Sequence, residues 1–395
     1  MERIERFIQS LGQTNQHPFL IDVDYAEGLY IIDKAGKRYA DMIAGVAVSS
    51  IGHRHPAVVQ AIKEQVDRHL HVMVYGEFIQ DAQLDMANQL IGLLPNTLDS
   101  VYAVNSGTEA NEAALKLVKR ATGRTELVAF RGSYHGSTHG SLSVSGNETK
   151  KMSFRPLLPD VRFLTFNAIS DLEHITEKTA GVIIETIQGD AGVRIPDIEF
   201  MKALRARCTE VGALLICDEI QCGLGRTGKH FAFQHYDIVP DVLTLGKALG
   251  GGMPVGALVA SHELLWQFTH NPMLGHITTF GGHPVIAAAS AAFLKVLKEE
   301  VDLEAVERRG QLLQDLLQQS NEITEVRRKG MMFAFDMAST ERVERVVKTC
   351  LEKGVLTFWF LSHPYSFRLS PPLTITDEEI LTVGQLILDA IHESA

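Results

Sequence analysis

Short apolar segments recur through the first two thirds of the chain, separated by longer amphipathic segments, and this alternation constrains the fold most strongly. The apolar segments have the length of strands and are apolar on both faces, which is typical of strands covered on both sides. Amphipathic segments such as Glu109–Ala121 and Glu199–Val211 have helical spacing. We therefore predict an α/β fold with a mainly parallel central sheet covered by helices. The expected strands are Val101–Val104, Glu126–Phe130, Val161–Leu164, Gly181–Glu185, Ala213–Cys217, Val242–Leu245 and Gly256–Val259.

After about Gly281 the pattern changes to longer helical segments, with short strand-like pieces at 331–336 and 355–358. This change predicts a smaller α+β lobe at the C-terminal end. The N-terminal segment, with its apolar run Leu29–Ile32 between two glycines, is expected to join that lobe. The expected domains are an N-terminal segment 1–45, a large domain 46–283 and a C-terminal small domain 284–395. The expected helices of the small domain are 284–299, 303–319, 340–353 and 377–391.

Bulk properties exclude several classes of protein. A protein that binds nucleic acid usually carries a stripe of basic residues, and the formal net charge of −11 does not favour such a partner. No apolar run approaches the ~20 residues of a membrane helix, and the segment Met1–Gln16 lacks the apolar core of a signal peptide. Four cysteines without metal spacing predict neither a disulfide framework nor a metal site. We expect a cytoplasmic protein that binds neither nucleic acid nor membrane.

Three polar segments follow predicted strands, where the carboxyl edge of a parallel sheet binds ligands. Ser106, Gly107 and Thr108 open a helix, whose N-terminal N–H groups and dipole favour a phosphate. Asp218 follows a buried strand, where a carboxylate can hold a proton on a heterocyclic nitrogen. Lys247 also follows a strand and precedes three glycines, and a lysine held in a pocket becomes a nucleophilic amine when its pKa is lowered.

Each of these signals has an ordinary structural explanation when taken alone, such as a helix cap or a solvated turn. Together they are far more specific, because a protein binds pyridoxal-5′-phosphate (PLP) through its phosphate, its ring nitrogen and its reactive carbon. The combination predicts a PLP enzyme in which Lys247 carries the cofactor as a Schiff base.

With these residues in place, the chain resembles the class III aminotransferases (subgroup II, fold type I), which depend on PLP, and most closely their acetylornithine/ornithine branch. The resemblance runs over nearly the whole chain as an ordered series of motifs. These are Gly28–Tyr30 with Asp33 and Gly36, Ala44–Val48, Gly52–Pro56, Asn105–Asn111, Tyr134–Gly136, Glu185–Gly189, Asp218–Gly228, Lys247–Pro254, Thr278–Gly282 and Arg368–Leu373.

The resemblance implies roles for single residues. Lys247 and Asp218 would be catalytic, Lys247 by moving a proton at the substrate carbon and Asp218 by pairing with the ring nitrogen. Arg368 would bind a substrate carboxylate, with Asp190 beside it. A homodimer is implied, with active sites at the subunit interface. The residues expected to bind the cofactor are Ser106, Gly107, Thr108, Tyr134, His135, Glu185, Asp218, Gln221, Lys247 and, reaching the neighbouring subunit, Thr279.

The implied reaction is transamination between a small-molecule amino donor and a keto-acid acceptor such as 2-oxoglutarate. The donor implied is an ω-amino acid such as ornithine or N-acetylornithine. The chain departs from the family pattern where Asp190 replaces a glutamate, Thr186 a proline and Ser137 an arginine. Three alternatives share the same lysine and aspartate: an aminomutase of the glutamate-1-semialdehyde type, a dialkylglycine-type decarboxylase, and a non-catalytic binding descendant.

Overall fold

The central feature of the computed structural model, which describes residues 2–394, is a seven-stranded sheet. Its strand order is β4-β10-β9-β8-β7-β5-β6. All the strands expected from the sequence are confirmed, and the sheet is parallel except for β10, which is antiparallel to both neighbours. The strands are β4 (Ser100–Val104), β5 (Glu126–Phe130), β6 (Val161–Leu164), β7 (Thr179–Glu185), β8 (Leu214–Asp218), β9 (Val242–Leu245) and β10 (Gly256–Ala260).

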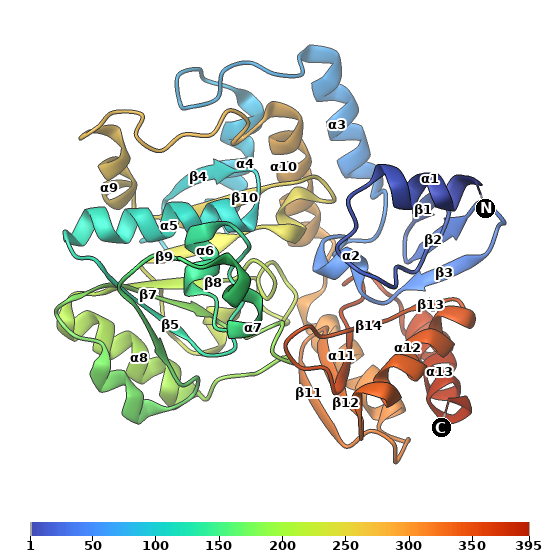
Figure 1. Cartoon of the computed structure of the whole chain (residues 1–395). Helices are drawn as coiled ribbons and strands as arrows, with labels where there is room; N and C mark the ends of the chain where they lie inside the picture. Colours follow the sequence, from blue (N-terminus) through green and yellow to red (C-terminus); the bar gives the residue numbers. More distant parts are fainter. Residues whose placement is uncertain (1, 395) are drawn as a thin grey trace.

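Helices cover both faces of this sheet, as the apolar strands require (Figure 1). On β8, Leu215 and Cys217 belong to the apolar cluster that contains helix α8 (Ile198–Val211). Ile216 points to the other face and joins the cluster formed by α5 (Gly107–Thr122). Alternate residues of a strand face opposite sides of a sheet, so β8 is buried on both. This double cover leaves the strand ends as the place where polar side chains can gather.

A second region combines the two ends of the chain. Strands β1 (Val23–Glu27), β2 (Tyr30–Asp33) and β3 (Arg38–Asp41) form a sheet with β13 (Val355–Leu356), so the blue and red segments lie side by side (Figure 1). A further sheet has the order β11-β12-β15-β14. Its strands are β11 (Glu325–Lys329), β12 (Met332–Asp336), β14 (Phe358–Trp359) and β15 (Ser366–Leu369).

One sequence expectation is corrected here. The strand-like piece expected at 355–358 is two strands in different sheets, because Val355 and Leu356 pair with β3 while Phe358 and Trp359 pair with β15. The helices of this region are α11 (Leu303–Leu317), α12 (Thr340–Glu352) and α13 (Asp377–Glu393), close to the expected bounds.

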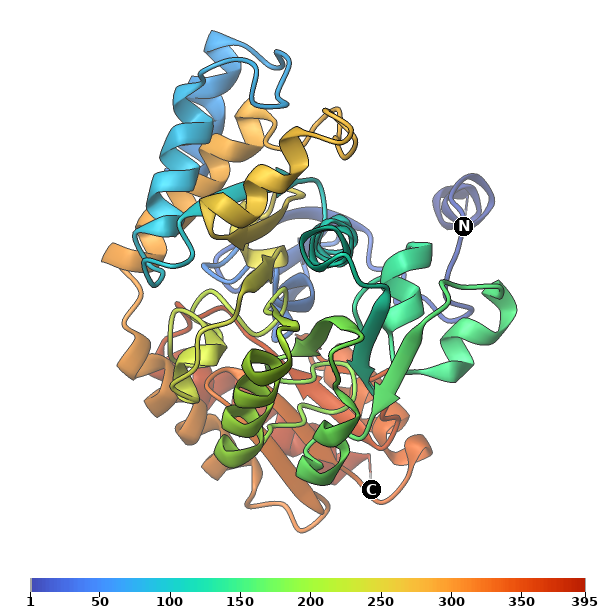
Figure 2. The same ribbon diagram turned by 90° about the vertical axis from the view of Figure 1, so that its left-hand side faces the viewer.

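Helix α10 (Pro284–Glu299) packs against α3 (Pro56–Arg68) and α4 (Asp81–Ile91), and the three stand together on one side of the molecule (Figure 2). Within residues 2–394 no helix has the length and apolar character needed to cross a membrane. The remaining helices are α1 (Glu2–Ser10), α2 (Ala44–Ala47), α6 (His139–Val144), α7 (Glu148–Lys151) and α9 (His262–Leu265). Short 3₁₀ helices are η1 (Met152–Phe154), η2 (Ile169–His174), η3 (Ala232–His235), η4 (Lys247–Gly250) and η5 (Trp266–Thr269).

Candidate active site

Neighbouring strand ends bring the predicted residues together. In the parallel ladder of β7 and β8, Glu185 pairs with Asp218, so both carboxyl groups emerge at one edge of the sheet. Lys247 follows the next strand, β9, at the start of η4. Its backbone has a φ of +45°, a left-handed conformation that a residue with a side chain adopts only when its surroundings enforce it. The fold therefore fixes the direction of this lysine as well as its place.

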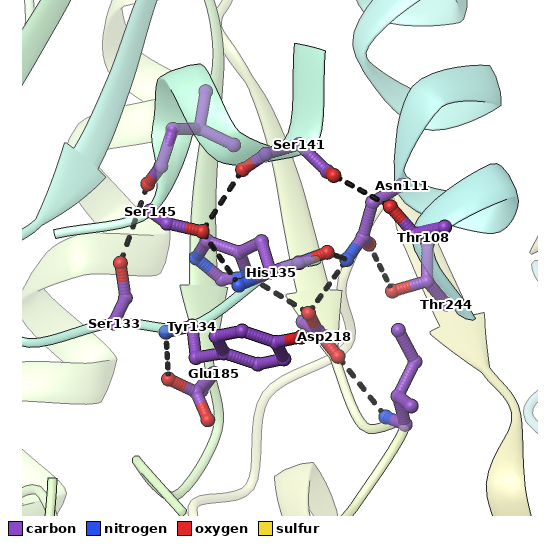
Figure 3. A network of polar contacts seen from close by, with 12 residues as sticks. Thr108, Asn111, Ser133, Tyr134, His135, Ser141, Ser145, Glu185, Asp218 and Thr244 are labelled. Atoms are coloured by element: carbon purple, nitrogen blue, oxygen red, sulfur yellow. Dashed lines mark hydrogen bonds and ion pairs between the residues drawn. The ribbon is translucent and has the colours of Figure 1, made fainter. Parts of the chain in front are cut away.

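The carboxylate of Asp218 is buried in a network of hydrogen bonds (Figure 3). Its Oδ2 lies 2.7 Å from His135 Nδ1 and accepts a bond from Asn111 Nδ2 at 2.8 Å. Its Oδ1 accepts a bond from the N–H of Ile220 at 3.0 Å. Asp218 is therefore held in one orientation by contacts to both of its oxygens.

Asn111 is a residue that the sequence reasoning missed. Its amide also donates to the backbone carbonyl of His135 at 2.7 Å, and its Oδ1 accepts a bond from Thr244 Oγ1 at 2.8 Å. All of its hydrogen-bonding partners are buried, as is Asn111 itself. The available signal was a lone asparagine on the otherwise apolar face of α5, beside Ala110 and Ala114. Such a polar residue is retained in a core only when its bonds are satisfied.

The imidazole of His135 has one partnered and one unpartnered nitrogen. Because the carboxylate of Asp218 can only accept, we assign the proton to Nδ1. Nε2 is buried and has no hydrogen-bond partner among the described residues. The histidine thus orients Asp218 from the side opposite to Ile220, and it completes the wall of the site.

The first turn of α5 forms the other end of the site. The hydroxyl of Ser106 caps this helix by accepting the N–H of Glu109 at 3.3 Å. The N–H groups of Gly107 and Thr108, as first residues of a helix, have no intrahelical acceptor. A Cβ at Gly107 would lie 2.7 Å from Cδ1 of Ile220, so only glycine fits there. The helix start therefore offers backbone donors at close range to a ligand.

A cavity of about 250 Å³ joins these groups. It does not include Ser106, Asp190 or Arg368 among the described residues that line it, and Thr279 lies apart on an exposed segment. Larger cavities lie elsewhere on the molecule, but they are not lined by Lys247, Asp218 or Glu185. The cavity is lined by Gly107, Thr108, Tyr134, His135, Gly136, Ser137, Glu185, Ile187, Asp218, Ile220, Gln221, Cys222 and Lys247.

Burial shifts the titration of two lining groups. Removal from bulk water lowers the pKa of Lys247, while the nearby carboxylate of Asp218 acts in the opposite direction. Burial raises the pKa of Glu185 to about 7, although its oxygens accept the N–H groups of Tyr134 at 2.8 Å and Gly189 at 2.9 Å. A lysine with a lowered pKa has a larger fraction of the free, nucleophilic amine.

Arg368, on β15, is 7% exposed, and its guanidinium carbon lies 5.0 Å from the ring centroid of Phe360. Within the part of the chain that the structure describes, its side chain has no hydrogen bond and no ion pair. Burial lowers its pKa, and the charges of Asp190 and Glu185 oppose this. A buried guanidinium without an acceptor is a receptor for an anionic ligand.

Asp190 makes other contacts. Its Oδ2 lies 2.6 Å from Nζ of Lys150 and accepts a bond from Oγ of Ser362 at 2.5 Å. Burial alone would raise the pKa of Asp190, but the bonds from Lys150 and Ser362 lower it overall. The expected neighbours Asp190 and Arg368 therefore influence each other by charge without an ion pair between them in the described chain.

The residues present fit PLP. The cavity has N–H donors at a helix start for a phosphate, an oriented carboxylate for a ring nitrogen and a lysine amine for an aldehyde carbon. This set of groups is the donor chemistry that the cofactor requires.

Comparisons with known proteins agree with this geometry. The profile of the family "Aminotransferase class-III" matches residues 11–391. The acetylornithine aminotransferase of Methanopyrus kandleri is 40% identical over 370 residues, 93% of each chain. The [LysW]-aminoadipate semialdehyde/glutamate semialdehyde transaminase of Sulfurisphaera tokodaii is 39% identical over 336 residues, 84% of each chain.

Solved structures give the same result. The ornithine aminotransferase of Toxoplasma gondii superimposes with a TM-score of 0.92 at 28% identity, over 99% of this chain and 94% of that one. Neither an aminomutase nor a decarboxylase is favoured by these similarities, since the relatives named are aminotransferases. The chain therefore belongs to the class III aminotransferases and catalyses PLP-dependent transamination.

Proposed function

We propose that this aminotransferase moves an amino group from an ω-amino donor, such as ornithine or N-acetylornithine, to a keto acid such as 2-oxoglutarate. The names of its relatives, acetylornithine and ornithine aminotransferases, support this choice of donor. The single observation that carries the assignment of the site is that Lys247 and Asp218 line the same cavity. Both stand at adjacent strand ends, one as an amine of lowered pKa and the other as an oriented carboxylate.

Lys247 and Asp218 are the catalytic residues of the proposal. When bound, PLP supplies an electrophilic carbon for amino groups and a ring that withdraws electrons from the substrate carbon. Nζ of Lys247 would hold that carbon when no substrate is bound, and as a free amine it would accept and return the proton of the substrate carbon. The carboxylate of Asp218 holds a proton on the ring nitrogen, and Asn111 and His135 keep the carboxylate in position.

The other residues bind and orient. Ser106, Gly107 and Thr108 hold the phosphate at the start of α5. Tyr134 and Gln221, which line the cavity, contact the ring, and Glu185 shapes it by fixing the backbone of Tyr134. Arg368 binds a substrate carboxylate as a bidentate pair, because its buried guanidinium has no acceptor in the described protein.

A homodimer completes the site in this proposal, with Thr279 reaching the phosphate of the partner subunit. Exposed apolar side chains near this segment support an interface there. They include Ile79, which is 91% exposed, Met273 at 74% and Phe280 at 52%. Such side chains are expected to be covered in the assembled protein.

The proposal extends to domain division and location. The segment 1–45 joins the small domain 284–395 beside the large domain 46–283, which the pairing of β3 with β13 supports. Helix α10, at the start of the small domain, also packs on the large one. A cytoplasmic location is supported by the four cysteines, all of which are free and buried within residues 2–394.

The test is to add PLP to the purified protein, record its visible spectrum and reduce it with borohydride. We expect a yellow band and, by peptide mass spectrometry, a reduced cofactor on Lys247. Lys247→Arg, which keeps the charge but not the nucleophile, should show neither. Ornithine or N-acetylornithine should bleach the band of the unmodified protein, and 2-oxoglutarate should restore it. Cofactor found on another lysine, or a band that no amino donor bleaches, would refute the proposal.

A further inference from the structure

We propose that Lys150 is a positioning residue that holds Asp190 away from Arg368 and so keeps this arginine open to the carboxylate of the keto acid. The inference rests on the proposed role of Arg368 and adds a determinant of substrate class. It comes from three charged groups that act on one another, the cations Lys150 and Arg368 and the anion Asp190.

Asp190 is held from two elements. Lys150 comes from α7, and Ser362 comes from the loop between β14 and β15. Both bond to the same oxygen, Oδ2, at 2.6 Å and 2.5 Å. Ser362 is fixed in turn by Asn147, whose Nδ2 donates to its Oγ at 2.8 Å. The carboxylate is thus fixed on one side by a chain of contacts that joins the large domain to the C-terminal region.

The ion pair is strong for physical reasons. The side chains of Lys150 and Asp190 are 25% and 10% exposed, so water screens the pair only partly. The ammonium also lies 4.9 Å from the ring centroid of Tyr134, which favours a cation at this place. Lys150 is therefore held in the position from which it binds Asp190.

Unlike Asp190, Arg368 forms no ion pair within the described residues. Its guanidinium touches the face of Phe360 and has no carboxylate at ion-pair distance among residues 2–394. The charge of Asp190 still acts on it over a longer distance. Lys150 and Arg368 both attract the carboxylate of Asp190, and of the two it is Lys150 that contacts it. After Lys150, Arg368 is the cation whose charge acts on Asp190.

This arrangement affects which substrates the site prefers. A substrate with a carboxylate next to its reacting carbon, such as glutamate or 2-oxoglutarate, finds Arg368 free. A terminal amine has no carboxylate at that carbon and leaves the buried guanidinium without a partner, which is unfavourable. The intact pair of Lys150 and Asp190 therefore favours the half-reaction of glutamate and 2-oxoglutarate over the half-reaction of the ω-amino donor, and loss of Lys150 reduces this difference in rate.

The experiment uses the holoenzyme and Lys150→Met. Binding of glutarate, a dicarboxylate that cannot react, is measured by calorimetry, and we expect its Kd to rise about tenfold as Asp190 moves to Arg368. In single half-reactions followed by absorbance, the rate ratio of glutamate to 5-aminopentanoate should fall by about the same factor. Lys150→Arg should behave as the unmodified protein. Lys202→Met on α8, which breaks the exposed pair with Asp237, controls for the loss of one positive charge.

The decisive comparison repeats Lys150→Met in an Asp190→Asn background. If Lys150 acts through Asp190, its loss has no further effect on the Kd of glutarate there. A tenfold loss that persists in this background, or an unchanged Kd in Lys150→Met alone, would overturn the inference. If Lys150→Met does not fold, Ser362→Ala removes the other contact and must change the Kd in the same direction. A holoenzyme that exchanges no amino group with any donor would instead refute the proposed function.

Discussion

The bond from Asn111 to Asp218 provides the sharpest test of how the site is held. Asn111→Ala removes the donor 2.8 Å from Oδ2 and leaves the other partners of Asp218 in place. A hydrogen bond to a buried charged group contributes about 1.5–3 kcal/mol. Because the cofactor ring is held by the ionised carboxylate, we expect the Kd of PLP to rise by a factor of roughly 10–100.

The same change also destabilises the fold. It leaves the hydroxyl of Thr244 and the carbonyl of His135 without their buried partner. An unsatisfied buried group costs about 1–3 kcal/mol, so the melting temperature of the cofactor-free protein should fall as well. Affinity is measured by absorbance titration with PLP, and stability by calorimetry without it. The two readouts separate orientation of Asp218 from packing.

Ser290→Ala is the matched control, since it removes a buried hydroxyl that has no hydrogen-bond partner in the described chain. It should change neither quantity appreciably. The reasoning is refuted if Asn111→Ala lowers the melting temperature while PLP affinity stays within about threefold of the unmodified protein, because Asn111 would then be only a packing residue.

Two further changes test the charges. Arg368→Gln should raise the KM for 2-oxoglutarate by about 100-fold, from the loss of a bidentate pair, with little change for 5-aminopentanoate; an equal effect on both would show that the arginine is structural. Burial raises the pKa of Glu219 from 4.5 to about 7, so this group contributes stability that is fully present below pH 4.5 and is lost as pH rises through 7. The shift corresponds to about 3 kcal/mol, and Glu219→Gln, which stays neutral, should flatten the fall in melting temperature over this range. The pKa of Glu185 is raised by a similar amount, so about half of the slope of melting temperature against pH should remain in Glu219→Gln. An unchanged slope would show that Glu219 does not cause the fall in stability.

The order of elements followed from the sequence because strand and helix patterns are local. Segments such as 126–130, 161–164 and 242–245 are strands with the expected bounds. The antiparallel direction of β10 was not predictable in this way, since direction depends on the path of the loop before it. Thr357 separates two strands of different sheets, and only tertiary contacts decide that division.

The site shows the same limit. Asp218 and Lys247 could be grouped from the sequence, because adjacent parallel strands end at one edge, while Glu185 was named only through the family resemblance. Asn111 and Lys150 could not be, since each acts on a residue far away in the chain. Lys150 lies outside the family motifs and Asn111 ends one of them without an assigned role, because both roles depend on which carboxylate the fold places beside them.

The three carboxylates around the cavity show how the fold assigns charge. Side-chain donors fix the orientation of Asp218, while burial raises the pKa of Glu185 to about 7, with only backbone donors at its oxygens. Asp190 is anionic but already paired with Lys150. Of the buried cations nearby, Arg368 is then the one whose counter-charge must come from outside the protein. In the proposed site, a substrate carboxylate neutralises the charge of Arg368 when it binds. Substrate specificity then depends on Lys150, which keeps Asp190 away from Arg368, as much as on the arginine itself.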